Sequence, residues 1–316
     1  MTTPVLLTVD TELTWGHYSR GASWRENFEL SYDPAGVGVP HQLRVLAEHG
    51  LKACFFVDPM PGLIYGLEPV RRMVAPILEA GQEIQLHLHS FWVSLAEGQA
   101  SGADFELTRF PPERQRELVR TARDLLMLGG APQPIAFRSG SYAADEATLD
   151  AVAAAGMRYD SSHNGSHHPW PSALPFGARM IAPASHRGVV EIPVTQIEQR
   201  AGSLRHLQIC AVSGDEMEQA LLHAAANRHP LVTIVTHSFE LATRDGRRRN
   251  PAICARFERL CRFLADERER LPTTRFDELG DLPLGRPAEP LPPRILRTAG
   301  RMAEQLWANG LYERAL

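Results

Sequence analysis

Short apolar runs alternate with longer amphipathic stretches along most of the chain. The apolar runs occupy residues 4–10, 53–57, 83–89, 134–138, 157–160, 189–194 and 231–236. The stretches with apolar positions at helical spacing occupy residues 41–49, 67–80, 111–128, 145–155, 216–226 and 253–270. Short apolar runs are typical of strands buried on both faces, and the helices between them indicate parallel β/α units. About seven strands favour a closed or nearly closed α/β barrel over an open sheet.

The composition changes after residue 279. Five prolines between residues 283 and 293 mark a linker, and residues 294–309 then have the pattern of an amphipathic helix. We therefore expect a β/α catalytic domain over residues 1–282, followed by a linker and C-terminal helix over residues 283–316. The simpler interpretation is that this helix packs back on the domain. Its arginines also favour a peripheral contact with a membrane or a protein partner.

Bulk composition narrows the class of protein. Hydrophobic residues make up 44% and charged residues 22% of the chain, which excludes a mainly disordered protein. The formal net charge of −4 gives no reason to expect a nucleic-acid partner. The N-terminus lacks a basic region followed by a long apolar stretch, no run reaches the roughly 18 apolar residues of a membrane span, and the cysteines form no CxxC pair. These features predict a cytoplasmic location.

Reactive side chains recur at the carboxyl ends of the predicted strands. They are Asp10, His87, His89, Arg138, Asp160 and His237. Because barrels place their active sites on this face, we expect these side chains to share one site. No glycine-rich phosphate-binding loop follows the first strand, which argues against a nucleotide-binding sheet.

Two of these strand ends have the composition of a metal site. Asp10 and Glu12 lie two residues apart, so one carboxylate can bind a divalent metal while the other accepts a proton from water. His87 and His89 also lie two residues apart, and side chains alternate along a strand, so both imidazoles face the same side. The pattern favours a metal held by the histidine pair.

The remaining strand ends suit proton transfer. Arg138 precedes a tight turn, so it can pair with a carboxylate while the backbone N–H groups of the turn hold an oxyanion. His237 ends an apolar strand and is either a core residue bonded to the backbone or a catalytic acid. Asp160 can orient that imidazole.

The order of these motifs resembles the polysaccharide deacetylase family, carbohydrate esterase family 4, from about residue 5 to residue 279. The resemblance implies a distorted (β/α)7-type barrel and hydrolysis of an N-acyl, chiefly N-acetyl, group on an amino sugar. It implies that a divalent metal, foremost Zn²⁺, binds Glu12, His87 and His89. It also implies that Asp10 is the base, Arg138 its partner, Asp160 the support of the acid and His237 the acid.

The sequence departs from the family pattern at two motifs. The family spaces its metal histidines four residues apart, whereas Phe91 occupies that position here and the second histidine is His89. The expected Arg-x-Pro-Tyr-Gly motif reads Arg-Ser-Gly-Ser-Tyr, which displaces the oxyanion donor by about one residue toward Tyr142. Such variants look like a divergent branch of bacterial surface-polysaccharide clusters, which implies a role in lipopolysaccharide or O-antigen biosynthesis.

Candidate substrate contacts follow from position. Trp15 and His17 come after the first motif, Tyr142 lies in the turn, and Arg247 belongs to an arginine cluster at residues 244–249. That cluster suits a sugar linked to a nucleotide or lipid through a diphosphate, although a solvated arginine loop explains it equally well. Two alternative functions remain: a deformylase or other amide hydrolase of the same fold, and a non-catalytic sugar-binding assembly protein. A base and an acid argue against the second.

Overall fold

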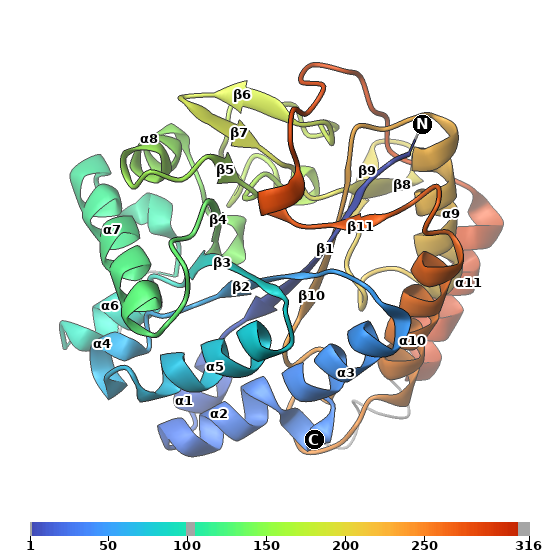
Figure 1. Ribbon diagram of the computed structural model, residues 1–316. Coiled ribbons are helices and arrows are strands. Elements are labelled where there is room, and N and C mark those ends of the chain that lie inside the picture. Colours follow the sequence, from blue (N-terminus) through green and yellow to red (C-terminus); the bar gives the residue numbers. More distant parts are fainter. Residues whose placement is uncertain (1, 99–104, 309–316) are drawn as a thin grey trace.

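The computed structural model describes residues 2–98 and 105–308 and contains one curled, largely parallel β-sheet with helices around it (Figure 1). The order of strands is β10-β1-β2-β3-β4-β5-β7-β6, and β11 pairs with β1. The strands are β1 (Val5–Thr11), β2 (Cys54–Val57), β3 (Glu83–Leu88), β4 (Ala136–Ser139), β5 (Tyr159–Asp160), β6 (Ala184–His186), β7 (Val189–Glu191), β10 (Val232–His237) and β11 (Thr273–Thr274). The predicted α/β class and distorted barrel are confirmed.

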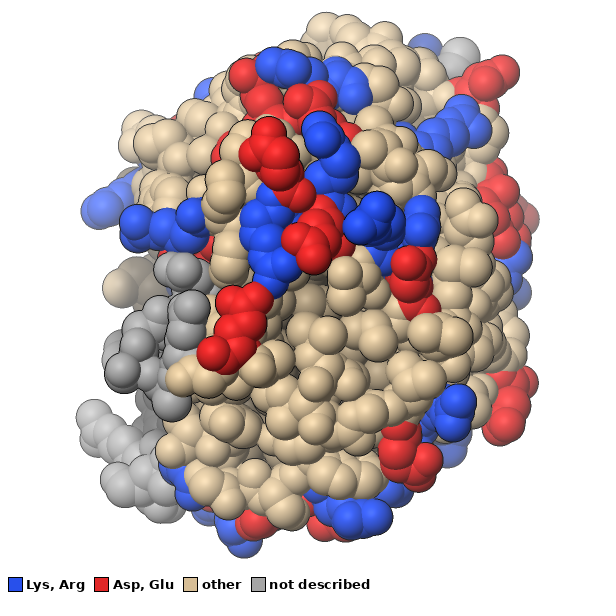
Figure 2. Space-filling view, turned by 90° about the vertical axis from the view of Figure 1, so that its left-hand side faces the viewer, with Lys and Arg blue, Asp and Glu red and all other residues tan. Residues whose placement is uncertain are grey.

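Helices line the outside of the curled sheet. They are α1 (Trp15–Tyr18), α2 (Trp24–Tyr32), α3 (Val39–His49), α4 (Gly62–Tyr65), α5 (Glu68–Glu79), α6 (Phe91–Ala96), α7 (Pro112–Leu128), α8 (Glu146–Ala154), α9 (Gly214–Ala226), α10 (Pro251–Asp266) and α11 (Ile295–Ala308). In α7, proline at the first position suits a helix start, and Leu118, Val119, Ala122 and Leu126 form the buried stripe. Figure 2 shows basic and acidic side chains interspersed on the side of the molecule that carries this helix, so no field of one sign extends across it.

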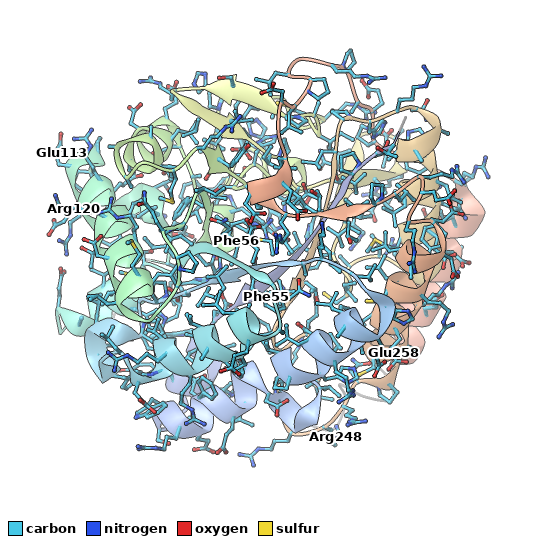
Figure 3. All side chains as sticks on the ribbon, viewed as in Figure 1. Phe55, Phe56, Glu113, Arg120, Arg248 and Glu258 are labelled. Atoms are coloured by element: carbon cyan, nitrogen blue, oxygen red, sulfur yellow. The ribbon has the colours of Figure 1, made fainter. Side chains whose placement is uncertain are left out.

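Strand β2 shows how alternation builds two cores. Phe55 and Phe56 are both fully buried, but they belong to different clusters because successive side chains leave opposite faces of a strand. Figure 3 places both phenylalanines in the interior and Glu113 and Arg120 at the periphery. Each fully buried phenylalanine stabilises the fold by roughly 1.5–3 kcal/mol relative to an exposed one. Phe56 also lies 4.3 Å below the Arg138 guanidinium, which links the core to the site.

The structure contains elements that the sequence pattern did not predict. Helix α2 begins at a serine cap, Ser23, whose hydroxyl accepts from the Glu26 N–H. A separate two-stranded antiparallel sheet is made by β8 (Gln196–Arg200) and β9 (Ser203–His206), and β6 forms an antiparallel pair with β7. The hairpin matters because it carries side chains to the end of β10.

Helix α11 packs on the domain through its arginines. Arg301 lies 3.2 Å from the Glu216 carboxylate of α9, and Arg297 donates to Gln219 at 3.3 Å. Ile295 and Met302 are exposed. The helix starts one residue after its predicted start, and its predicted end at Asn309 lies outside the described residues. Among the helices described, none has the length and apolar character that crossing a membrane requires.

Candidate active site

Strand register brings the predicted site residues together at one end of the sheet. In the parallel pair β1–β10, Asp10 lies opposite His237, and in the pair β3–β4, His87 lies opposite Arg138. Glu12 and His89 follow the ends of β1 and β3 directly. Because the carboxyl ends of parallel strands share an edge, four strands converge on one small volume.

Glu12, His87 and His89 form a group that can hold a metal ion. One ligand atom from each lies within 4.8 Å of the other two. Glu12 Oε2 is 3.2 Å from His87 Nε2 and contacts His89 Nε2. His87 Nδ1 donates to the Arg138 carbonyl at 2.7 Å, which leaves the lone pair of its Nε2 directed at the site. Two imidazoles and one carboxylate are the donor set of many zinc hydrolases, so the residues fit the metal that the resemblance implies.

The charges in this group favour a cation. Burial raises the pKa of Glu12, but the charge of His89 and the close contacts with both imidazoles hold it well below its ordinary value. Burial lowers the pKa of His89, and the Glu12 carboxylate outweighs it and raises the pKa to about 9. In the absence of metal, a proton on His89 therefore supplies the positive charge that Glu12 attracts.

Asp10 and Arg138 form a buried ion pair beside the metal-binding group. Arg138 Nη1 donates to Asp10 Oδ1 at 2.6 Å and to the Thr8 hydroxyl at 2.9 Å. The other side of the guanidinium donates to the carbonyl and hydroxyl of Ser161 at 3.2 and 3.0 Å. Arg138 has no exposed surface, so these contacts fix its position and, through it, that of Asp10. Asp10 Oδ2 takes no part in the pair and lies 3.9 Å from His237 Nε2.

His237 is held by residues that sequence reasoning did not identify. Gln208, which follows β9, lies 3.2 Å from His237 Nδ1 and donates to Glu240 at 2.6 Å. Glu240 also accepts from the Thr236 hydroxyl at 2.7 Å and the His237 N–H at 3.2 Å. The sequence offered one signal for Glu240: it comes three residues after His237, and a carboxylate at that distance past a strand end can fold back on the end of the strand.

Asp160 forms its contacts away from His237, the imidazole that we expected it to orient. Its carboxylate accepts from the Ser162 N–H at 3.0 Å and the Ser162 hydroxyl at 2.8 Å, and it is hydrogen-bonded to Glu191, its register partner on β7. Burial raises the pKa of both carboxyls, and the Asp160 charge raises that of Glu191 further. Across the described residues no hydrogen bond joins Asp160 to His237, so Glu240 occupies the supporting place that we expected Asp160 to fill.

The environment of His237 gives a pH prediction. Burial lowers its pKa, but the hydrogen bond and charge of Glu240, together with Asp10, raise it to about 9, so the imidazole is protonated at neutral pH. A general acid acts below its pKa and is lost as the pH rises through it. Glu240→Gln is therefore expected to move the alkaline limb of the rate–pH profile down by about one unit or more. The Glu258→Gln exchange on exposed α10 surface is the control, and an unmoved limb in Glu240→Gln would contradict this support.

A third carboxylate next to the metal-binding group was also missed. Asp58 follows β2, accepts from the Met60 N–H at 3.0 Å through Oδ1, and is fully buried. Its Oδ2 has no hydrogen-bond partner among the described residues. Burial raises its pKa to about 6, against the opposing charges of His89 and His87. The predicted strand ended one residue before it, although the same strand-end rule applied.

The predicted substrate contacts take different places around the site. Trp15 packs in an aromatic cluster, 5.4 Å from Phe91, and Tyr142 is buried with its ring 5.6 Å from that of His167. His17 lines a pocket of about 580 Å³ that also includes His237. Arg247 is exposed and lies 3.5 Å from Glu26 at the rim of a smaller neighbouring hollow.

The turn after β4 is where an oxyanion donor was expected. Ser141 and Tyr142 both have left-handed backbone conformations, with φ of 55° and 60°. Consecutive left-handed residues other than glycine are uncommon and are concentrated at functional sites. Burial and the nearby charge of Asp10 raise the pKa of the Tyr142 hydroxyl, as expected for a turn that lies near the ion pair.

Comparison with known proteins identifies the fold. No protein-family model matches the sequence, and no curated protein matches it. A candidate polysaccharide deacetylase from Mycobacterium smegmatis matches the structure with a TM-score of 0.55 and 20% identity, over 91% of this chain and 95% of its own. The 4-alpha-glucanotransferase of Thermococcus litoralis matches with a TM-score of 0.56 and 12% identity, over 88% of this chain and 40% of its own. The two neighbours bear different activities, so function is argued from the site. The chain has the fold of the polysaccharide deacetylases.

Proposed function

We propose that the protein is a metal-dependent deacylase that hydrolyses an N-acyl, chiefly N-acetyl, group of an amino sugar. The observation that carries this proposal is the Asp10–Arg138 ion pair between the Glu12, His87 and His89 group and His237. A protein that only binds sugar needs no buried base beside a protonated imidazole. Sugar specificity is supported by the name of the neighbour from Mycobacterium smegmatis and by the order of motifs.

The side chains can be assigned to the steps of amide hydrolysis. When bound, a divalent metal would lower the pKa of a water and polarise the acyl carbonyl. Asp10 Oδ2, the oxygen that Arg138 leaves accessible, takes a proton as the water oxygen attacks the carbonyl carbon. Backbone N–H groups of the turn at Ser141 and Tyr142 stabilise the oxygen that becomes negative.

His237 completes the reaction. It lies on the far side of Asp10 from Arg138 and is protonated at neutral pH, since its pKa is raised to about 9. It donates its proton to the amine nitrogen as the C–N bond breaks, so the products are a carboxylic acid and a free amino sugar. Glu240, whose Oε2 lies 4.0 Å from His237 Nδ1 and accepts from the His237 backbone N–H, keeps the imidazolium in place during the transfer.

Acetate release from a panel of N-acetylhexosamines, measured together with metal content, tests the proposal. We expect about one divalent ion per chain and release that stops on chelation and resumes when Zn²⁺ is restored. N-formyl analogues in the same panel decide between a deacetylase and a deformylase. Purified protein that binds these sugars without metal and releases no acid would overturn the proposal in favour of a binding protein.

A further inference from the structure

A pocket beside His237 has a size and a lining that the acyl chemistry does not explain. Its volume is about 580 Å³, within the range of small-molecule sites, and its wall includes His237, Glu240 and Gln208. A hollow of about 200 Å³ shares His17, Arg20 and Leu30 with it and extends it toward the surface. The pocket therefore runs from the end of β10 to solvent.

Three arginines from separate segments line this pocket. Arg20 follows α1, Arg244 lies in the loop after β10, and Arg256 belongs to α10. The Arg20 guanidinium donates to His17 Nδ1 at 3.0 Å, and among the described residues no carboxylate lies within ion-pair distance of it. Burial, aided by the Arg20 charge, lowers the pKa of His17, so this imidazole is neutral and accepts that hydrogen bond.

The negative charge of the pocket wall is already engaged. Glu240 lines the pocket, but it accepts hydrogen bonds from Gln208, Thr236 and the His237 backbone. It is therefore directed at the protein and at the acid rather than at the arginines. Glu26 and Asp245 line the adjoining hollow, where Glu26 lies 3.5 Å from Arg247 and Asp245 accepts from the Thr243 hydroxyl and the Arg247 N–H. Among the described residues that line the larger pocket, Glu240 is the one carboxylate and three are arginines.

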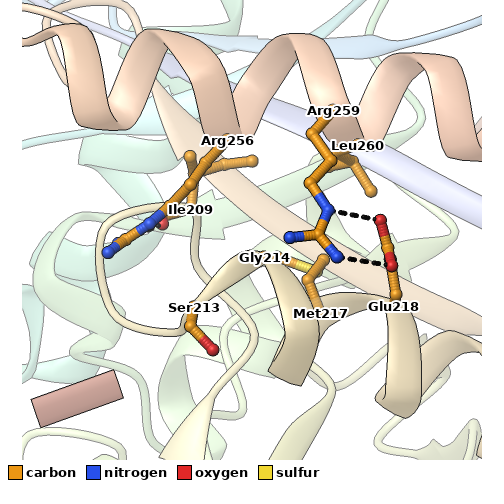
Figure 4. A pocket seen from close by; sticks show the side chains of 8 residues that line it. All are labelled: Ile209, Ser213, Gly214, Met217, Glu218, Arg256, Arg259 and Leu260. Atoms are coloured by element: carbon orange, nitrogen blue, oxygen red, sulfur yellow. Dashed lines mark hydrogen bonds and ion pairs between the residues drawn. The ribbon is translucent and has the colours of Figure 1, made fainter. Parts of the chain in front are cut away.

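Arg256 forms a fixed part of the wall. It donates to the carbonyls of Ile209 and Val212 at 3.5 and 3.1 Å and pairs with Glu304 of α11 at 3.0 Å. Figure 4 shows that it extends away from Arg259, which belongs to the same helix and is turned to Glu218. The space between those two arginines is only about 10 Å³, so the ligand-sized volume lies on the His237 side of Arg256.

The loop that carries Arg244 is built to a defined shape. The Thr243 hydroxyl accepts a hydrogen bond from the Arg248 backbone N–H. The Thr243 backbone N–H in turn donates to the Arg248 carbonyl at 2.8 Å. Gly246 has φ of +71°, and a Cβ there would lie 2.7 Å from the Leu30 carbonyl oxygen. Only glycine allows the loop to approach α2 this closely. The loop thus closes the pocket from one side with Arg244 in its wall.

We infer that this pocket binds an anionic group, a phosphate or a carboxylate, carried by the acylated sugar. The inference rests on the proposed function for the sugar, while the recognition of the anion rests on the arginines alone. Guanidinium groups from two or more directions match the several oxygens of either anion. The pocket adjoins His237, so an anion bound there holds the sugar with its acyl nitrogen near the acid.

Matched substrates test the inference. The ratio of kcat/KM for N-acetylglucosamine 6-phosphate, N-acetylglucosamine 1-phosphate and an N-acetylhexosaminuronic acid to that for N-acetylglucosamine is measured on the metal-loaded protein. At least one anionic sugar is expected to be preferred, and Arg20→Gln and Arg244→Gln are each expected to reduce that preference about tenfold or more. Arg244→Lys should keep more of it than Arg244→Gln, and Arg120→Gln on α7 should leave it intact. The three anionic sugars separate a phosphate from a carboxylate.

Calorimetric titration with inorganic phosphate separates failure of the inference from failure of the proposed function. Glu12→Gln serves as the background, so that phosphate at the metal-binding group does not contribute. Phosphate binding that Arg20→Gln and Arg244→Gln weaken supports the anion pocket, even if no sugar loses its acyl group. Equal kcat/KM for neutral and anionic sugars, with phosphate binding insensitive to both arginines, overturns the inference and leaves the deacylase intact.

Discussion

Asp10→Asn is expected to reduce the rate of acyl release by about a thousandfold, the usual range for loss of a general base. The exchange keeps the shape of the side chain but removes the carboxylate that takes the proton of water. Its Oδ2 lies 3.9 Å from His237 Nε2 and is not used by Arg138, so the exchange removes the oxygen to which we assign the proton transfer. Acetate release under saturating metal measures the effect.

The same variant carries a structural cost that must be measured separately. Arg138 has no exposed surface, and removing the partner of a buried ion pair costs about 3–5 kcal/mol. Thr8, Ser161 and the Phe56 ring still hold the guanidinium, so we expect a lowered melting temperature rather than an unfolded chain. Asp10 is outside the metal-binding group, so metal content should be unchanged. Activity within tenfold of wild type would show that Asp10 is not the base.

The sequence predicted the site because strand alternation and strand ends are local properties. Two histidines spaced by one residue must share a face, and the structure places both against Glu12. The ends of parallel strands must share an edge, and register then sets Asp10 beside His237. Short apolar runs are also a local property of the chain, and they predicted strands buried on both faces and hence the α/β class.

What the sequence did not predict depends on contacts across the sheet. Asp160 and Glu240, the carboxylate that supports His237, both lie at or near strand ends. Only the β5–β7 register shows that Asp160 faces Glu191 instead of His237. Gln208 reaches His237 from a hairpin whose pairing has no helical or apolar signature in the sequence. The sequence therefore predicts which reactive residues lie at strand ends. It does not predict which residue holds each of them, because that depends on which strands become neighbours in the sheet.

The pairing of neighbouring strands also determines which carboxylate forms the ion pair with Arg138. Arg138 is close to three carboxyl-bearing residues, yet it forms its ion pair with Asp10, while burial raises the pKa of both Asp160 and Glu191 and so disfavours full negative charge on that pair. A second full negative charge behind the arginine would weaken its hold on Asp10. The buried pair therefore lets Arg138 serve the base alone.

Glu12→Gln is expected to abolish tight metal binding and, with it, acyl release, at least as completely as Asp10→Asn. The exchange keeps the size of the side chain but removes the carboxylate that contacts both His87 and His89. An amide is a far weaker ligand for a divalent ion, and two neutral imidazoles alone hold it loosely. Metal content after dialysis, measured beside acetate release, gives the result, and Glu113→Gln on the surface of α7 is the matched control.

Proton release distinguishes this loss of a ligand from general damage. In the metal-free protein the pKa of His89 is raised to about 9 by Glu12, so at pH 7 the incoming metal must displace a proton from that imidazole. Metal affinity should therefore rise with pH up to about 9, and titrations of the wild type in two buffers of different ionisation enthalpy should show about one proton released. Glu12→Gln lowers the pKa of His89, so the residual weak binding of that variant should release fewer protons. A Glu12→Gln protein that binds one metal as tightly as wild type would show that the carboxylate is not a ligand and that the metal, if required, is held elsewhere.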